Sequence, residues 1–362
     1  LDDPETLLDT LRNGGSAMVD LGDLNERLLI DRELAILGEE LGDPAEALRG
    51  HLRSAMDYLS LARLSDAFRA MHACERLAES LSHPAYTWRS VALYALRALW
   101  EGRLEQAEEL IDKAHRLGAE ANDPNSEAVY IAQKLRLLQY RGDFEAQLPM
   151  LERLSKFLLG SEIGIATAQI VIGNEHSLAG RIEIARGFFD GETIRRLLRL
   201  GDDSIQLAIA RLSVTAGDVE LAERLHRRMS MNREHMVNGG VLLMVLEGPT
   251  SWGLAYVCQL LGRPEEATEH FTHALEAARR LGGRPVTALV ALEYAHHLTT
   301  QSGGNVPQAA RDLAALARET AADVGMTAVE REAATLVASS PTASGANEDC
   351  LLYTSPSPRD GT

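Results

Sequence analysis

The sequence predicts an all-α fold: an α-solenoid of about seven to eight helix-turn-helix repeats, wound into a right-handed superhelix. The strongest observation is a series of small turn residues, about 40 residues apart, with a helical apolar pattern on each side. Proline-marked helix starts recur with the same period. In addition, only 5% of the residues are aromatic and Ala, Leu, Glu and Arg dominate, a composition that favours helix over sheet.

Proline in the first helical turn marks three helix starts. Asp43-Pro44, His83-Pro84 and Asp123-Pro124 each lie 40 residues after the one before. Proline suits this position because the N–H that it lacks would have no partner there. Residues 1–42 are expected to form N-terminal helices that lead into the solenoid, which is expected to span residues 43–337.

Each repeat is expected to turn at a small residue between its two helices, and its second helix follows a common pattern. After Gly262, small Ala267 and Ala274 flank large Phe271. Small residues let neighbouring helices approach closely, while the large residue fills the groove between them. The seven predicted turn residues are Ala62, Gly102, Gly142, Gly180, Gly217, Gly262 and Gly304.

The repeats resemble the tetratricopeptide repeat, although its usual unit is shorter, about 34 residues. Runs such as NERLLIDRELAILGEELGDPAEALRGHL and LGRPEEATEHFTHALEAARRLGGRPVTALVALEYAHHL extend the resemblance. Over about residues 5–335, the chain is similar to the C-terminal helical-repeat region of large bacterial signalling ATPases. These are MalT-like and LuxR-type transcriptional regulators, and adenylate/guanylate cyclases with a central ATPase module.

This resemblance implies a cytoplasmic sensor or interaction segment of a larger ATP-dependent regulator. Its concave face would bind a partner domain, another protein or a small-molecule inducer. The alternative is a freestanding tetratricopeptide-repeat scaffold for protein–protein interaction. No catalytic residue, cofactor or enzymatic activity is expected in this segment, because it contains no P-loop, no H-E-x-x-H and no G-x-S-x-G motif.

Composition and charge argue against other classes of protein. The formal net charge of −17 disfavours general nucleic-acid binding, which needs a basic face. The longest apolar run, residues 241–246, is far too short to cross a membrane. The three cysteines form neither a disulfide framework nor a zinc pattern, and Cys74 and Cys258 are expected to be small core residues.

Binding residues are expected on the concave face, which the first helix of each repeat would line. Polar residues at these positions also suit a merely solvated surface. Residues 236–251, in the longest gap between turns, are expected to form an extra short helix or a hydrophobic plug, and a partner contact if exposed. The candidate concave-face residues are Arg89, Gln133, Arg136, Gln139, Asn174 and Gln259.

Histidines provide the best metal candidate in the sequence, and we interpret them as surface residues without a metal. His270 and His273, next to Glu269, are expected on the exposed side of their helix, and His296 and His297 lie in the next repeat. The three tryptophans are expected to pack between helices rather than to stack on a ligand. They are Trp88, Trp100 and Trp252.

The two ends of the sequence do not look native. It begins with Leu in the middle of a helical pattern, so we expect the natural chain to be longer. Residues 338–349 are rich in Ser, Ala, Gly and Pro and are expected to form a flexible linker. Residues 350–362 resemble a translated sequencing adapter and are expected to be an artefact of read-through.

Overall fold

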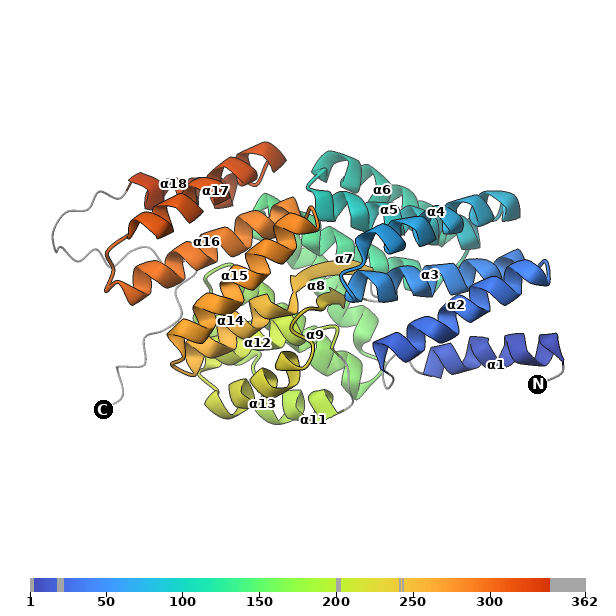
Figure 1. Cartoon of the computed structure of the whole chain (residues 1–362), viewed down its shortest axis with the longest axis horizontal. Coiled ribbons are helices and arrows are strands. Elements are labelled where there is room, and N and C mark those ends of the chain that lie inside the picture. Colours follow the sequence, from blue (N-terminus) through green and yellow to red (C-terminus); the bar gives the residue numbers. More distant parts are fainter. Residues whose placement is uncertain (1–2, 18–22, 200–202, 241, 243, 339–362) are drawn as a thin grey trace.

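The computed structural model describes residues 3–17, 23–199, 203–240, 242 and 244–338, and over these it is an all-α solenoid that encloses a β-hairpin (Figure 1). The predicted linker and adapter tail lie outside the described residues, apart from Ala338. The elements are α1 (Pro4–Ala17), α2 (Leu24–Glu40), α3 (Pro44–Ser60), α4 (Leu64–Leu81), α5 (Pro84–Glu101), α6 (Leu104–Glu120), α7 (Pro124–Arg141), α8 (Phe144–Leu158), α9 (Glu162–Leu178), α10 (Ile182–Gly187), α11 (Gly191–Arg199), α12 (Gln206–Ala216), α13 (Val219–Ser230), β1 (Met236–Gly239), β2 (Val245–Pro249), α14 (Thr250–Leu260), α15 (Pro264–Arg280), α16 (Arg284–Gln301), α17 (Gln308–Val324) and α18 (Thr327–Ala338).

All seven predicted turn residues lie between paired helices and adopt a left-handed backbone. Their φ angles run from +58° at Ala62 to +90° at Gly304. This conformation reverses the chain after a helix and is easiest for glycine, which explains why six of the seven positions hold glycine. The pairs that they join are α3/α4, α5/α6, α7/α8, α9/α10, α12/α13, α14/α15 and α16/α17.

The three proline-marked helix starts are confirmed as well. Pro44, Pro84 and Pro124 are the first residues of α3, α5 and α7. The residue before each proline caps its helix: the Asp43 carboxylate, for example, accepts hydrogen bonds from two backbone N–H groups at 3.1 Å. Such caps satisfy N–H groups that have no partner within the helix.

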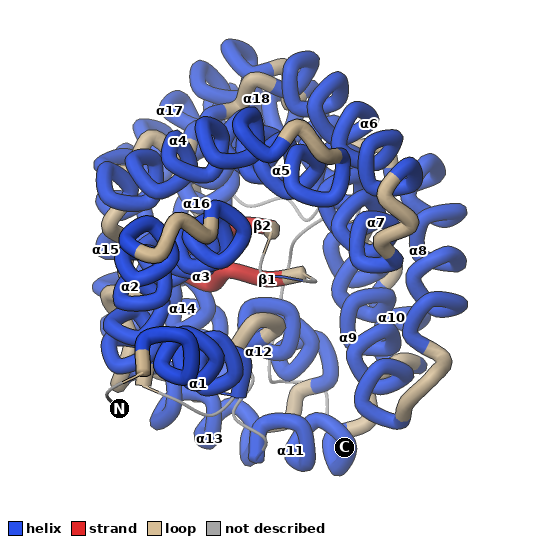
Figure 2. Tube along the Cα trace, turned by 90° about the vertical axis from the view of Figure 1, so that its right-hand side faces the viewer, coloured by secondary structure: helices blue, strands red, loops and turns tan. Residues whose placement is uncertain are grey.

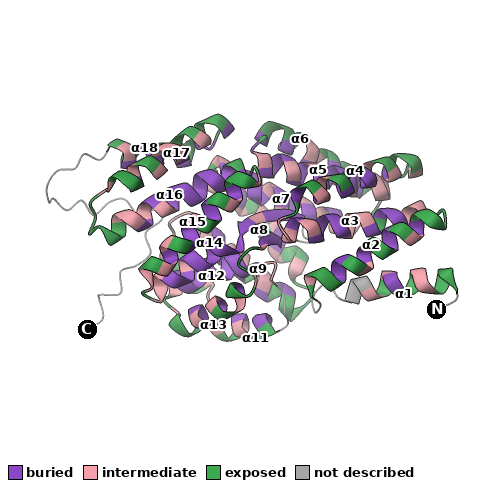
Figure 3. Ribbon diagram, viewed as in Figure 1, coloured by how far each residue is buried: buried purple, intermediate pink, exposed green. Residues whose placement is uncertain are grey.

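The first helix of a repeat lies on the inner side of the solenoid and is more deeply buried than the second. Ten of the 18 residues of α5 are buried, against five of the 17 of α6. Figure 3 shows the same contrast, with exposed residues along the outer helices. The small residues predicted for close helix packing are buried, including Ala107 and Ala267, both fully covered. Trp88, Trp100 and Trp252 are also buried, which confirms their packing role.

The solenoid winds so far that its later repeats touch its earlier ones. The indole Nε1 of Trp100, at the end of α5, donates a hydrogen bond to the carbonyl of Leu281, 181 residues later, at 2.8 Å. The Trp100 ring lies against Gly283, where an added Cβ would come within 2.3 Å of it. The α5 helix therefore packs against α16, and the helices form a closed ring when viewed along the long axis (Figure 2).

A β-hairpin fills the middle of this ring, where an extra helix or a plug was expected. Strands β1 and β2 pair antiparallel and lie inside the ring of helices (Figure 2). Of the two alternatives for residues 236–251, the extra helix is wrong, since Gly240 takes a φ of +75° at the turn and the flanking residues pair as strands, and the hydrophobic plug is confirmed by the burial of those strands. Met236 and Met244 are at most 4% exposed, so the paired strands are not a free partner surface, although Leu242 at the turn is 39% exposed.

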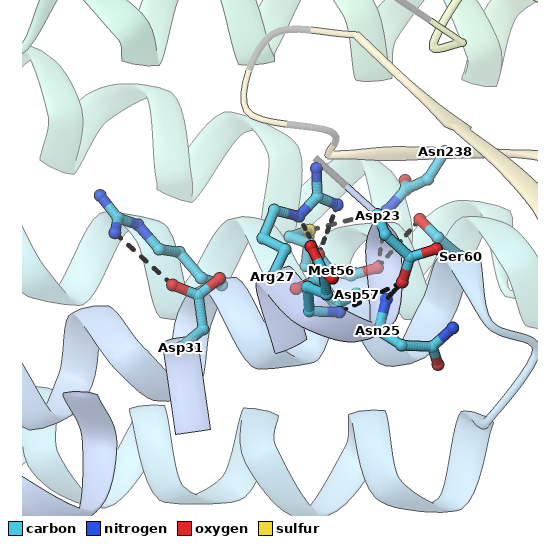
Figure 4. Close-up of polar contacts among 10 residues, drawn as sticks. Asp23, Asn25, Arg27, Asp31, Met56, Asp57, Ser60 and Asn238 are labelled. Carbon is cyan, nitrogen blue, oxygen red and sulfur yellow. Dashed lines mark hydrogen bonds and ion pairs between the residues drawn. The ribbon is translucent and has the colours of Figure 1, made fainter. Parts of the chain in front are cut away.

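Polar contacts attach the hairpin and α2 to α3 (Figure 4). The Nδ2 of Asn238 on β1 donates to the backbone carbonyl of Met56 on α3 at 3.5 Å. The buried guanidinium of Arg27 on α2 donates to Asp57 on α3, with Nε to Oδ1 at 2.8 Å. Burial, followed by the nearby Asp57 charge, raises the pKa of Asp31 to about 7.

Candidate functional site

A cavity of about 250 Å³ lies beside the hairpin inside the ring, and we call it the luminal cavity. Helices α7, α8, α9 and α12 and the hairpin enclose it. Most of its wall is apolar, from side chains such as Leu135, Leu154, Val171 and Ile205. Its polar side chains include Arg136, Gln139, Asn174, Glu175 and Glu247. A mostly apolar cavity with a few polar groups is typical of small-molecule sites.

An ion pair between α7 and the hairpin forms the centre of the polar groups. The guanidinium of Arg136 pairs with the Glu247 carboxylate, and its Nη1 donates to Oε1 of Gln139 at 2.6 Å. Burial is the largest single influence and acts to lower the pKa of Arg136, but the charge and hydrogen bond of Glu247, together with Tyr140 and Glu175, outweigh it and raise that pKa. Arg136 therefore stays charged in the lumen, where Glu247 neutralises it.

Glu247 reaches this position because of a β-bulge. Val237 pairs with Gly248 and Asn238 pairs with Leu246, so Glu247 is the extra residue of β2. A bulge twists a strand locally and redirects the side chain of the extra residue. Its carboxylate pairs with Arg136 on α7, and Val245, two residues earlier, lines the same cavity.

Asn174 and Glu175, neighbouring residues of α9, are the remaining polar residues of the cavity wall discussed above. Burial raises the pKa of the Glu175 carboxyl to about 7, although Arg136 opposes that shift. The Nδ2 of Asn174 donates to Oε1 of Glu175 at 3.1 Å. The other end of this amide, Oδ1, is buried and has no hydrogen-bond partner, and Asn174 is only 6% exposed. A buried, unpaired acceptor costs free energy unless a ligand or water satisfies it.

Three of the six predicted concave-face residues meet at this cavity, and three do not. Arg136, Gln139 and Asn174 line it. Gln133 is buried and instead supports the hairpin, because its Nε2 donates to the carbonyls of Ala92 and Met244, each at 2.9 Å.

The other two predicted residues make contacts between neighbouring helices. Arg89 pairs with Asp123 at 2.5 Å, and Nε2 of Gln259 lies 2.9 Å from Nδ1 of His297. The expected open concave groove is not free, because the hairpin lies inside the ring of helices (Figure 2). Sequence reasoning missed Glu175 and Glu247. The bulge that redirects Glu247 has no pattern in the sequence, whereas the position of Glu175 beside Asn174 was a usable signal.

The predicted histidine group does not assemble. His273 is exposed as expected, but His270 is buried at 9% exposure, which corrects the prediction of a surface residue. The His297 Nδ1 faces Gln259, and His296 pairs with Glu332 at 2.8 Å, so each ring faces another partner. The physical reason for the burial is that α15 turns the His270 face toward α13 and α14 rather than toward solvent.

Comparison with known proteins does not assign the chain to a family. No model of a known protein family matches the chain, and no curated protein matches it. Among solved structures, the chain is similar to a "circular tandem repeat protein with novel repeat topology and enhanced subunit contact surfaces". That match has 14% identity, covers 92% of this chain and 80% of the other, and has a TM-score of 0.19, too low to support a functional argument. None of the described helices is both long and apolar enough to cross a bilayer.

Proposed function

We propose that this chain is a helical-repeat sensor scaffold that binds a small molecule in the luminal cavity. The observation that carries the proposal is the unpaired, buried Oδ1 of Asn174 beside the ionisable Glu175, in a cavity that is otherwise mostly apolar. A peptide in an open groove is less well supported, because the hairpin occupies that groove.

The polar groups favour a ligand that donates hydrogen bonds. Asn174 Oδ1 and the Glu175 carboxylate are both acceptors, and Arg136 is already neutralised by Glu247. A primary ammonium group would donate to these acceptors and favour the ionised form of Glu175. The apolar wall would cover the remainder of the molecule. The ligand class that fits is therefore a small amine with an apolar body.

Isothermal titration calorimetry with hexylamine, hexanol and hexanoate tests this proposal. Hexylamine is expected to bind best, at one molecule per chain, and more weakly as the pH falls below about 7, because Glu175 becomes protonated. Glu175→Gln is expected to weaken its binding by about 10- to 100-fold, the value of a charge-assisted hydrogen bond. Glu162→Gln, at an exposed position on the same helix, is the matched control. Tighter binding of hexanoate, or unchanged binding by Glu175→Gln, would contradict the proposal.

The wider part of the proposal places this scaffold in a larger ATP-dependent regulator, as the sequence resemblance implies. Ligand binding would then favour one of two arrangements of the whole protein, through its different affinity for each. The reading frame upstream of the Leu1 codon tests this part. An encoded P-loop there would support a regulator with DNA-binding or cyclase output, and a nearby start codon would support a freestanding scaffold.

The freestanding scaffold has one observation of its own in its favour. Large apolar side chains are exposed around the turn between α8 and α9, with Leu159 at 62% and Ile163 at 53%. Exposed apolar clusters are typical of protein contact sites. Under this alternative, Ile163→Ser removes co-purifying partners and leaves amine binding unchanged. Glu175→Gln weakens amine binding and leaves the co-purifying partners in place.

A further inference from the structure

Four side chains from three consecutive helices converge outside the luminal cavity. They come from α13, α14 and α15, and one potential ligand atom of each lies within 4.8 Å of the other three. We call this group the three-helix cluster, and its members are His226, Cys258, Glu266 and His270.

Two distances within the three-helix cluster bracket the ligand spacing of a tetrahedral metal site. The Nε2 of His226 lies 2.6 Å from Oε1 of Glu266, and the Nε2 of His270 lies 3.8 Å from the same oxygen. Ligands around a tetrahedral zinc ion are separated by about 3.3–3.6 Å, as bond lengths of about 2.0–2.3 Å require. Small side-chain rotations would therefore bring the four atoms to that spacing.

Ligand chemistry and charge favour zinc among the divalent cations. A thiolate, a carboxylate and two neutral imidazoles carry a charge of about −2, which neutralises one divalent ion in a buried site. Cys258 is fully buried, while Glu266 is about one-third exposed and leaves a path for the ion to enter. The guanidinium of Arg263 lies 3.8 Å from Oε2 of Glu266 and 3.5 Å from Nδ1 of His226, and its hydrogen bond to Glu223 at 2.6 Å is a contact that it can keep when the ion binds.

We propose that the three-helix cluster binds one Zn²⁺ ion with four protein ligands. On binding, the Cys258 thiol gives up its proton to solvent, and neutral His226 carries its single proton on Nδ1, so that the sulfur, Nε2 and carboxylate electron pairs face the metal. Four protein ligands leave no open position, so the site is structural rather than catalytic.

The place of the cluster in the chain indicates what the ion does. The hairpin segment, residues 231–249, connects α13 to α14, and the two helices carry His226 and Cys258. An ion shared by these helices fixes α13 and α14 relative to each other, on either side of the segment that enters the ring. Zinc binding therefore holds the hairpin in place, independently of any ligand in the luminal cavity.

Cobalt substitution of the full chain tests this site directly. Co²⁺ is expected to give a visible tetrahedral band and a near-ultraviolet thiolate band at one ion per chain. Cys258→Ser should remove the thiolate band, and His226→Gln should weaken binding more than tenfold. His273→Gln, an exposed residue on the same helix as His270, is the matched control and should behave like the wild type.

Thermal unfolding provides a second readout. Zn²⁺ at a hundredfold excess over its Kd should raise the Tm of the wild type and of His273→Gln by about 4 °C, and that of His226→Gln by less than about half as much. A thiolate band that persists in Cys258→Ser would overturn the proposal. So would the absence of a band in the wild type, or equal losses in His226→Gln and His273→Gln.

Discussion

The regular repeats α3–α8 and the hairpin segment 231–249 are held in place by contacts of different range. Within the repeats, each helix packs mainly on the next helix in the chain, as α3 does on α4 and α5 does on α6. The hairpin instead contacts α3, α5, α7, α14 and α15. Its hydrogen bonds join residues 182 positions apart at Asn238 and Met56, and 111 positions apart at Gln133 and Met244.

This difference distinguishes the contacts that stack neighbouring repeats from the contacts that close the ring of helices. Local contacts specify a helix pair and its neighbour, and they can be repeated without limit. The distant contacts specify one arrangement of the whole chain, because they exist only when early and late repeats meet. The luminal cavity lies where the two kinds of contact join, between the repeats α7–α9 and the hairpin.

The largest loss of stability is expected when a contact between residues far apart in the sequence is removed. Trp100→Ala removes a buried ring that packs against Gly283 and donates to the Leu281 carbonyl. It should lower the free energy of unfolding by about 3–5 kcal/mol, measured by chemical denaturation. Ile36→Ala, at a side chain that is 51% exposed, should change it by less than about 0.5 kcal/mol. Equal effects of the two variants would mean that closure of the ring adds no stability.

A local contact should give a smaller loss. Ala267→Leu adds bulk at a fully buried position between paired helices, so it should destabilise the fold by about 1–3 kcal/mol. Glu269→Leu adds an apolar side chain to the exposed face of the same helix and should be nearly neutral. Thermal melts without a loss for Ala267→Leu would show that the close approach of these helices is misassigned.

The smallest change in stability is expected from the pH-dependent protonation of Asp31, a buried carboxyl group between α2 and α3. The pKa of Asp31 is raised from 3.8 to about 7. Between pH 3.8 and pH 7 the folded chain therefore binds one more proton at this residue than the unfolded chain does. The stability contributed by that proton falls as the pH rises through 7. Between pH 6 and 8, the wild type should lose about 1 kcal/mol more than Asp31→Asn. Asp9→Asn, at an exposed carboxylate, should follow the wild type, and parallel curves for all three proteins would refute the shift.

Features that depend on a few neighbouring residues could be predicted from the sequence. The turn glycines, the proline-marked helix starts and the small residues at close helix contacts were all predicted correctly. The inward direction of Arg136 and Asn174 also followed from the helical register. The hairpin did not, because the strand conformation of residues 245–249 depends on distant helices that cover both of its faces.

The luminal cavity and the three-helix cluster could not be predicted fully from the sequence, because their residues come together only in the folded chain. Glu247 enters the luminal cavity through a bulge, and Glu175 gains its raised pKa only from burial by the assembled ring. The three-helix cluster draws on residues 32 positions apart at His226 and Cys258, where no short motif connects them. A histidine at an apparently polar helix position can therefore be buried once its neighbours are in place.

The hydrogen bond from Trp100 to Leu281 also sets an order of events during synthesis. At about 5–20 residues per second, a ribosome takes roughly 9–36 s to add the 181 residues that separate these partners. Throughout that interval the early repeats can stack, but the surface that later receives α16 and the hairpin is uncovered. The nascent chain therefore exposes apolar inner helices for many seconds, which makes it prone to aggregation before the ring is complete.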